Sequence, residues 1–330
     1  MSVKNRGALS TITLGVFCVL SGWTAQGQIY VAYTGRYNGD GGVAEYSLSG
    51  ESINSQFIYG YDGCYGLTLD ENGHLWVANT LGSGVDEYTT SGAYLGGLPL
   101  TSATTDSPGA LAVDGAGDLF VAYGGSGVSQ FTTSGMLVHD PLVSGLPLTG
   151  LAVAGNNLYL ANPITGTIGQ YTTAGATVNA SLITGLSTPG DLAYDGNGHL
   201  FVANTGDGTI GEYSTSGGII NASLVSGLSG LESLALDGDG HLFVLSGNTI
   251  GEYTTSGATM NASLITVTGL NGLGEIVVVP EPSSLAFIGL GLGFLFLGLR
   301  QRTAQQMAGE RIRAIRSSFG GRRSEFRIRD

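Results

Sequence analysis

The chain has 330 residues, of which 42% are hydrophobic and 57 are glycine, and it shows no Gly-X-Y period, so neither a disordered chain nor a collagen is expected. The formal net charge of −13 argues against a nucleic-acid partner, because contacts to phosphate need clustered Lys and Arg. Basic residues are concentrated at the two ends. Residues 28–279 contain one basic residue, Arg36, against 21 acidic ones, so the chain is expected to consist of separate parts.

The N-terminal 27 residues have the three regions of a secretory signal peptide. Lys4 and Arg6 form the positive region, and Thr11 to Leu20 is a short apolar run. Ala25 and Gly27 then supply the small residues that a signal peptidase needs at −3 and −1. The apolar run is too short to span a bilayer permanently. We therefore predict export and cleavage after Gly27.

A repeat of about 42 residues fills the region 28–279. One marker is an apolar run such as LFVAN or LYLAN, and the other is Glu-Tyr-Thr-Thr-Ser-Gly or a variant, whose aromatic residue recurs at spacings of 42, 43, 40, 42 and 40. This period is typical of propeller blades or of helical arrays. The segments are short, rich in Val, Ile, Tyr and Thr, and separated by Gly and Asp-Gly, which favours strands. The sequence therefore predicts an all-β fold.

Each repeat predicts four strands. In the fifth complete unit these are Ser233–Leu236, Leu242–Leu245, Thr249–Thr254 and Thr259–Thr266. Five units are complete, while residues 28–60 supply only the last three strands of a unit and residues 274–279 look like an isolated first strand. A ring of radially packed sheets must join its ends. We therefore predict a six-bladed β-propeller over residues 28–279, with its last blade closed by N- and C-terminal strands.

The C-terminal region has the marks of a sorting segment. Residues 283–299 carry no charge and reach the lower length limit of a transmembrane helix, and arginines follow from Arg300, which places the C-terminus in the cytoplasm. Pro280, Glu281 and Pro282 precede this helix. A Pro-Glu-Pro tripeptide, an apolar helix and arginines, over residues 280–302, closely resemble the PEP-CTERM sorting signal. The resemblance implies an exosortase-type processing enzyme as partner. The chain departs from the family by continuing as an Arg-rich tail, residues 303–330.

The repeats themselves resemble NHL-type and streptogramin-lyase-like propellers, in which an Asp-x-x-Gly turn precedes an apolar strand. Such a fold carries enzymes, receptors and scaffolds alike. Lyase-type relatives use a histidine with a carboxylate close by, and we expect no such pairing within one blade here. His74, His199 and His241 share one repeat position, which places them at separate points around the ring and indicates a scaffold role. His139 has no predicted partner. No catalytic residue is predicted.

No metal-binding residues are predicted either. Turns such as Asp195-Gly-Asn-Gly and Asp237-Gly-Asp-Gly resemble the start of a calcium loop but lack its later ligands, so a β-turn is expected. Ca²⁺ is the one cofactor for which the sequence shows part of a binding motif. Polar residues at the end of the second strand are candidates for ligand binding near the mouth of the central channel, with an Asx turn as their alternative role. These are Asn79, Asn162 and Asn204, with Tyr33, Tyr123 and Ser246 at the same repeat position.

Three functions remain open from the sequence. The first is an exported, non-catalytic propeller that binds envelope or matrix material, including exopolysaccharide, since the sorting family is associated with exopolysaccharide production. The second is a hydrolase or lyase of the lactonase or streptogramin-lyase type. The third is an NHL-type protein-interaction scaffold. In each case the protein is expected at the cell envelope or in the extracellular matrix, held in the membrane by the C-terminal helix until it is processed.

Overall fold

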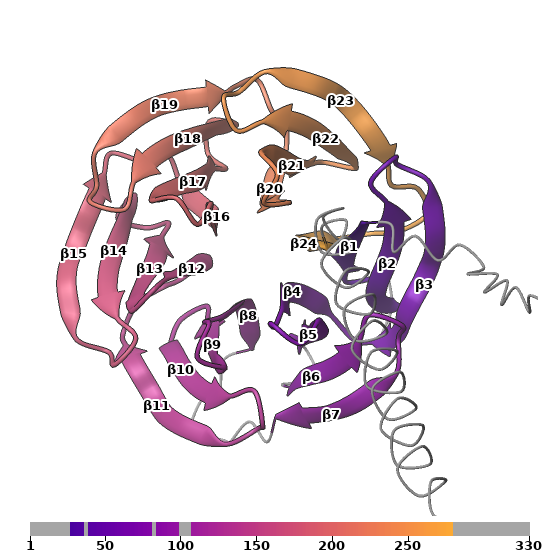
Figure 1. The fold of residues 1–330 in the computed structure, drawn as a ribbon, viewed down its shortest axis with the longest axis horizontal. Helices are drawn as coiled ribbons and strands as arrows, with labels where there is room; N and C mark the ends of the chain where they lie inside the picture. The colour runs from indigo at the N-terminus through magenta and orange to yellow at the C-terminus, as the bar shows by residue number, and fades with distance from the viewer. Residues whose placement is uncertain (1–26, 36–38, 81–83, 99–106, 280–330) are drawn as a thin grey trace, which may run out of the picture.

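The computed structural model describes residues 27–35, 39–80, 84–98 and 107–279. The predicted signal peptide, except Gly27, and the whole of the sorting segment and tail lie outside these residues. Within the described ranges, no helix is long and apolar enough to cross a membrane. The described residues form six four-stranded sheets arranged radially around an axis (Figure 1). The predicted six-bladed propeller is confirmed.

The strands follow one another around the ring, four to a blade. The first three blades after the N-terminal strands comprise β4 (Cys64–Leu69), β5 (His74–Asn79), β6 (Gly84–Thr89) and β7 (Tyr94–Leu98); β8 (Pro108–Val113), β9 (Asp118–Tyr123), β10 (Gly127–Thr132) and β11 (Leu137–Ser144); and β12 (Gly150–Ala154), β13 (Asn157–Asn162), β14 (Thr167–Thr172) and β15 (Thr177–Thr184). The next two comprise β16 (Pro189–Tyr194), β17 (His199–Asn204), β18 (Thr209–Ser214) and β19 (Ile219–Val225); and β20 (Leu231–Leu236), β21 (His241–Ser246), β22 (Thr249–Thr254) and β23 (Thr259–Thr266).

The sixth blade joins the two ends of the propeller. Its strand order is β24 (Leu273–Val279), β1 (Gln28–Tyr33), β2 (Gly41–Ser47) and β3 (Ser52–Tyr61). Strand β1 is antiparallel to β24, with Gln28 opposite Val279 and Val31 opposite Ile276. The predicted closure by N- and C-terminal strands is therefore confirmed.

Two side-chain-capped turns recur in the blades, and the second of them contains a sequence marker of the repeat. In the turn between the first and second strands, Asp70 Oδ1 accepts the backbone N–H groups of Asn72 and His74 at 2.9 Å each. In the Thr-Thr-Ser-Gly turn, Thr254 Oγ1 accepts the N–H of Ala258 at 3.0 Å, and Gly257 adopts φ of 85°. A side chain with a Cβ is strained at that φ, which explains the glycine of the marker.

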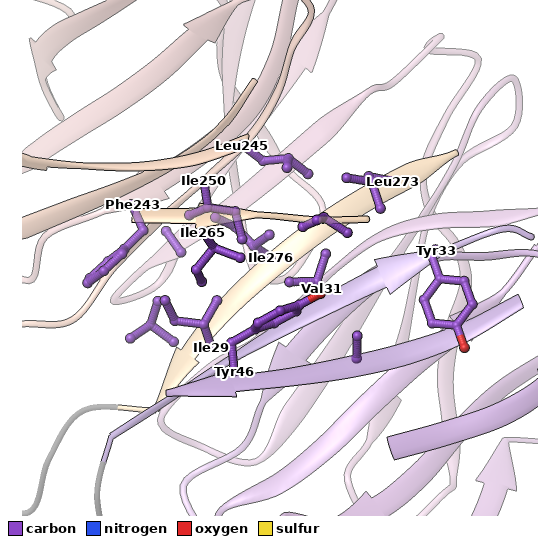
Figure 2. Packing of buried hydrophobic residues seen from close by; sticks show 14 residues of the cluster. Ile29, Val31, Tyr33, Tyr46, Phe243, Leu245, Ile250, Ile265, Leu273 and Ile276 are labelled. Carbon is purple, nitrogen blue, oxygen red and sulfur yellow. The ribbon is translucent and has the colours of Figure 1, made fainter. Parts of the chain in front are cut away.

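The core lies between neighbouring blades rather than within one sheet. One cluster at the closing blade combines buried side chains of β1, β2 and β24 with those of β21 to β23 in the preceding blade (Figure 2). Ile276 is 3% exposed and packs there with Val31 and Phe243. Cys64, the free cysteine of the described residues, is fully buried in the next cluster. Burial between blades thus stabilises a ring whose described part has no disulfide.

Candidate functional site

A cavity of about 640 Å³ lies at one end of the propeller axis. Its walls come from the starts of the innermost strands and from residues that follow the second strands, as Gly66, Asp191, Glu275, Thr80 and Thr205 show. Six innermost strands, β4, β8, β12, β16, β20 and β24, surround this axis (Figure 1). The cavity is therefore formed by equivalent positions of all the blades, where a ligand would contact several blades at once.

One position of the innermost strand determines the chemistry of the wall. It directly precedes a buried Leu or Ile that pairs with the second strand in every blade. Around the ring the residues at this position are Gly66, Ala110, Gly150, Asp191, Ser233 and Glu275. Three consecutive blades thus carry small residues, and the other three carry oxygen acceptors. The sequence repeats alone did not single out this position, because the residues have no common type.

The three acceptors each bind the following blade in the same way. Asp191 Oδ2 accepts the N–H of Leu234 at 3.0 Å, and Ser233 Oγ accepts the N–H of Ile276 at 3.1 Å. Glu275 Oε2 then accepts the N–H of Leu67 at 2.8 Å. Each acceptor therefore satisfies a backbone donor that the strand ladder of the next blade leaves unpaired.

Asp191 is the most buried carboxylate of this set. It is 7% exposed, and it accepts two further hydrogen bonds, from Ser233 Oγ at 2.7 Å and from its neighbour Leu192 N–H at 2.7 Å. Burial raises the pKa of Asp191 above its ordinary value, and the hydrogen bonds from Leu234, Ser233 and Leu192 oppose this rise. The side chain is thus held rigidly at the cavity wall.

Glu275 faces the same cavity from the closing strand. Loss of hydration raises the pKa of Glu275 well above its ordinary value, the charge of Asp191 raises it further, and the bond from Leu67 N–H opposes both. A third carboxylate, Glu232, is exposed on the cavity wall, and partial burial raises its pKa as well. No lysine or arginine occurs among the residues that the structure describes, so these carboxylates have no basic counter-charge there.

The substitution Glu275→Gln is expected to stabilise the protein at pH 7. A carboxyl group whose pKa is higher in the folded state binds its proton more tightly there, so ionisation lowers stability as pH rises from about 4.5 toward the folded-state pKa. Glutamine keeps an acceptor for Leu67 N–H and cannot ionise. Thermal unfolding at pH 4 and pH 7 measures the effect, since each kcal/mol relieved raises Tm by about 2–4 °C in a domain of this size. An equal change at both pH values would contradict this explanation.

The rim of the cavity adds hydroxyl groups and one aromatic ring. Thr80 Oγ1 donates to the carbonyl of Pro108 at 3.2 Å, and Thr149 Oγ1 donates to that of Pro189 at 2.7 Å, so each joins two blades. Their oxygen lone pairs remain as acceptors. Tyr65 lines the cavity with 45% of its surface exposed. The site as a whole is rich in acceptors and suits a ligand with O–H or N–H donors.

The asparagines predicted for ligand binding lie beside this cavity but not in its wall. Asn162 Oδ1 accepts the N–H groups of Ile164 and Thr165 at 3.1 Å each, which is the alternative Asx-turn role. Asn204 is 3% exposed and donates from Nδ2 to Thr209 Oγ1. The lining is formed instead by the residues one position later, such as Thr80 after Asn79. A ligand-binding role for the three asparagines stays a prediction.

The expectation that no histidine would lie beside a carboxylate within one blade is wrong. His74 Nδ1 lies 2.6 Å from Glu87 Oε1 and 3.5 Å from Asp70 Oδ2. The same arrangement recurs in two other blades, at His199 with Asp195 and Glu212 and at His241 with Asp237 and Glu252. Two features of the sequence could have indicated these clusters. The Asp of the turn precedes each histidine by four residues, and the Glu lies on the third strand, which pairs with the second strand that carries the histidine.

These histidine clusters lie at the turn between the first and second strands, at the opposite end of the inner strands from the axial cavity. The ligand atoms of Asp70, His74 and Glu87 lie within 4.8 Å of one another, so they are spaced to hold a divalent ion. The β-turn predicted at Asp237 is confirmed, because its Oδ1 accepts the N–H groups of Asp239 and His241.

His139 also differs from expectation. It has a partner, since its Nδ1 lies 3.0 Å from Gln130 Oε1 on the neighbouring strand. Gln130 Nε2 in turn donates to Asp118 Oδ2 at 2.9 Å. In this blade Asp118 occupies the repeat position that His74 has in its own blade. The hydrogen bonds that link His139, Gln130 and Asp118 are found here in place of a histidine cluster.

Comparison with known proteins identifies the C-terminal motif through a family model and the propeller through its fold. Residues 278–302 match the family model of the PEP-CTERM protein-sorting motif, which confirms the resemblance carried by Pro280, Glu281 and Pro282. The motif implies export, exosortase processing and sorting of the protein to the cell surface through its C-terminal segment. None of the curated proteins matches the chain.

The propeller itself is similar to solved structures of low sequence identity. A chain in the crystal structure of a nidogen/laminin complex aligns with a TM-score of 0.62 and 13% identity, over 77% of this chain and 99% of that one. A protein of unknown function from Bacteroides caccae aligns with a TM-score of 0.59 and 14% identity, over the same shares. A streptogramin B lyase structure aligns with a TM-score of 0.47 and 17% identity, over 78% of this chain and 74% of that one. At these identities the first two likenesses show the fold alone. The chain is thus a six-bladed β-propeller that carries a C-terminal PEP-CTERM sorting motif.

Proposed function

We propose that this protein is a non-catalytic binding propeller displayed at the cell envelope or in the extracellular matrix. Its axial cavity takes a polar ligand with hydroxyl or amino donors, such as a segment of an exopolysaccharide. The observation that carries the proposal is the acceptor-rich wall formed by Asp191, Ser233, Glu232 and Glu275, with no lysine or arginine among the described residues. Anionic ligands such as phosphates or nucleic acids would be repelled there.

The direction of the closing strand supports display of the cavity. Strand β24 starts beside the cavity, where Gly274 and Glu275 line the wall, and ends at Val279 at the other end of the blade, next to Gln28. The matched sorting motif begins at residue 278. Before exosortase processing, the protein would be held in the membrane by its predicted helix over residues 283–299. The segment that leads to this helix would leave the propeller at the end opposite the cavity. The cavity would then point away from the membrane.

The test is binding of the purified full chain to polysaccharide isolated from its host's envelope. Glu232→Gln and Tyr65→Ala each alter an exposed residue of the cavity wall, so both variants are expected to fold. Glutamine at position 232 replaces a charged acceptor by a neutral one, and alanine at position 65 removes an aromatic contact, so each variant should lose about 1 kcal/mol and bind roughly fivefold more weakly. Glu51→Gln, an exposed carboxylate on the turn between β2 and β3, is the matched control. Unchanged affinity in both wall variants, or capture of a defined protein that glycans do not displace, would overturn the proposal.

A further inference from the structure

A second cavity, of about 480 Å³, lies where the two ends of the propeller meet. Its walls are Tyr33, Gly35, Asp40, Gln56 and Tyr59 from the N-terminal strands and their connections, together with residues 269–271 before β24. The two sides are joined by backbone hydrogen bonds, since the N–H groups of Thr34 and Gly35 donate to the carbonyl of Asn271 at 3.2 and 3.1 Å. This cavity therefore exists only when the ring is closed.

Tyr33 lines this cavity, and its hydroxyl group is buried without a hydrogen-bond partner. Tyr33 is 2% exposed, and its Oη forms no hydrogen bond in the described structure. Burial without a partner costs a hydroxyl group about 1–3 kcal/mol, so such groups are rare in native proteins. Burial, followed by the nearby Tyr59, raises the pKa of Tyr33 to about 12, so the hydroxyl keeps its proton as a donor. The unpaired group points to a ligand that supplies the missing hydrogen bond.

The other side chains around the cavity combine an aromatic face with both donors and acceptors. Tyr59, a lining residue, is 53% exposed, and its hydroxyl donates to Asp40 Oδ1 at 3.1 Å, which restricts the orientation of the ring. Gln56 is exposed beside it, and Asn271 stands on the opposite wall. Amide groups can donate and accept at the same time, as sugar hydroxyls do, and an exposed tyrosine ring packs on the apolar face of a sugar. An anionic ligand would meet the Asp40 carboxylate.

We propose that this second cavity binds a neutral saccharide, with the Tyr33 hydroxyl as a hydrogen-bond donor to it, the amides of Gln56 and Asn271 on its hydroxyl groups, and the Tyr59 ring on its face. The site is separate from the axial cavity. A ligand here contacts both the N-terminal blade strands and the segment that leads into β24, so binding stabilises the closed ring. It therefore raises Tm as the logarithm of one plus the ratio of its concentration to Kd.

The experiment measures binding of cellotetraose, maltotetraose and chitotetraose to the full chain by calorimetry, together with Tm at each saccharide concentration. At least one saccharide is expected to bind and to raise Tm. Tyr33→Phe removes one hydrogen bond, so it should weaken that binding about fivefold while the Tm of the free protein stays the same or rises. Gln56→Ala, on the exposed side of the cavity, should weaken binding without altering the fold.

Two controls separate this site from others. Tyr94→Phe alters a tyrosine that is 61% exposed on a different blade, and Glu232→Gln alters the axial cavity, so both should keep the affinity for the saccharide. The proposal is overturned if none of the three saccharides binds, or if binding is insensitive to both Tyr33→Phe and Gln56→Ala. A loss in Glu232→Gln alone would assign the saccharide to the axial cavity instead, and failure of the axial proposal leaves this result unaffected.

Discussion

Truncation of the chain after Asn271 is expected to abolish cooperative folding of the propeller. The deletion removes β24, including Leu273, Ile276 and Val278, which are each at most 5% exposed in the core of the closing blade. Burial of each such side chain contributes about 2 kcal/mol, so about 6 kcal/mol is lost before the ladder bonds to β1 are counted. That approaches the whole stability of a typical domain, about 5–15 kcal/mol. Thermal unfolding followed by near-ultraviolet circular dichroism measures the loss.

Truncation ten residues later, after Glu281, supplies the control. This chain also lacks the tail and the apolar segment but keeps β24, so it should unfold cooperatively at the Tm of the full chain. A synthetic peptide of residues 271–281 should restore part of the transition to the shorter chain, because the sheet partner of β24 is β1, from the other end of the propeller, and this pairing does not need the covalent link to β23. If the shorter chain unfolded with unchanged Tm, closure by β24 would not be what stabilises the ring.

The substitution Gly66→Ala is expected to lower stability by about 3 kcal/mol or more. A Cβ at Gly66 would lie 1.8 Å from the carbonyl oxygen of Gly109 in the next blade. The obstacle is backbone, so relief requires the innermost strands of two blades to move apart, and overpacking of this kind typically costs about 1–3 kcal/mol and occasionally more. Gly66 also lines the axial cavity. Urea unfolding should show a lower midpoint, and ligand affinity at the axial cavity should fall as well.

Gly96→Ala is the matched control, because a Cβ at Gly96, on the outer strand β7, would meet nothing within 4 Å. Its stability should change by less than about 1 kcal/mol. The comparison separates close approach of inner strands from the general effect of replacing glycine in a strand. Equal losses of stability in the two variants would show that the close approach of the innermost strands does not require glycine at position 66.

The sequence predicted the fold closely because the repeat is a local pattern. In the unit used as the example, the predicted strands at Thr249–Thr254 and Thr259–Thr266 match the structure to the residue. The first strand of that unit begins at Leu231, two residues before the predicted start. Ring closure followed from counting strands, since an N-terminal unit without its first strand and a C-terminal strand without its unit complete each other.

The candidate sites followed far less from the sequence. Comparison of the repeats assigns a scaffold role to a residue that several blades share, and it does not detect a position whose residues differ. The cavity wall contains such a position, at Asp191, Ser233 and Glu275. The same comparison also treated the histidines as isolated, although His74 lies against Glu87 of the neighbouring strand. Tyr33 shared a repeat position with the candidate asparagines, but nothing in the repeat showed that its hydroxyl would be buried without a partner.

The sequence by itself therefore determined the number of blades, their strands, the closing pair and the sorting motif, because hydrophobic period, turn residues and motif spacing are local properties of the chain. Only the tertiary structure decided which residues meet. Asp191 satisfies a backbone donor of the next blade 43 positions away, and Glu275 reaches Leu67 across 208 positions. Such contacts depend on how the ring brings blades together around its axis, where burial and charge set the chemistry of both cavities.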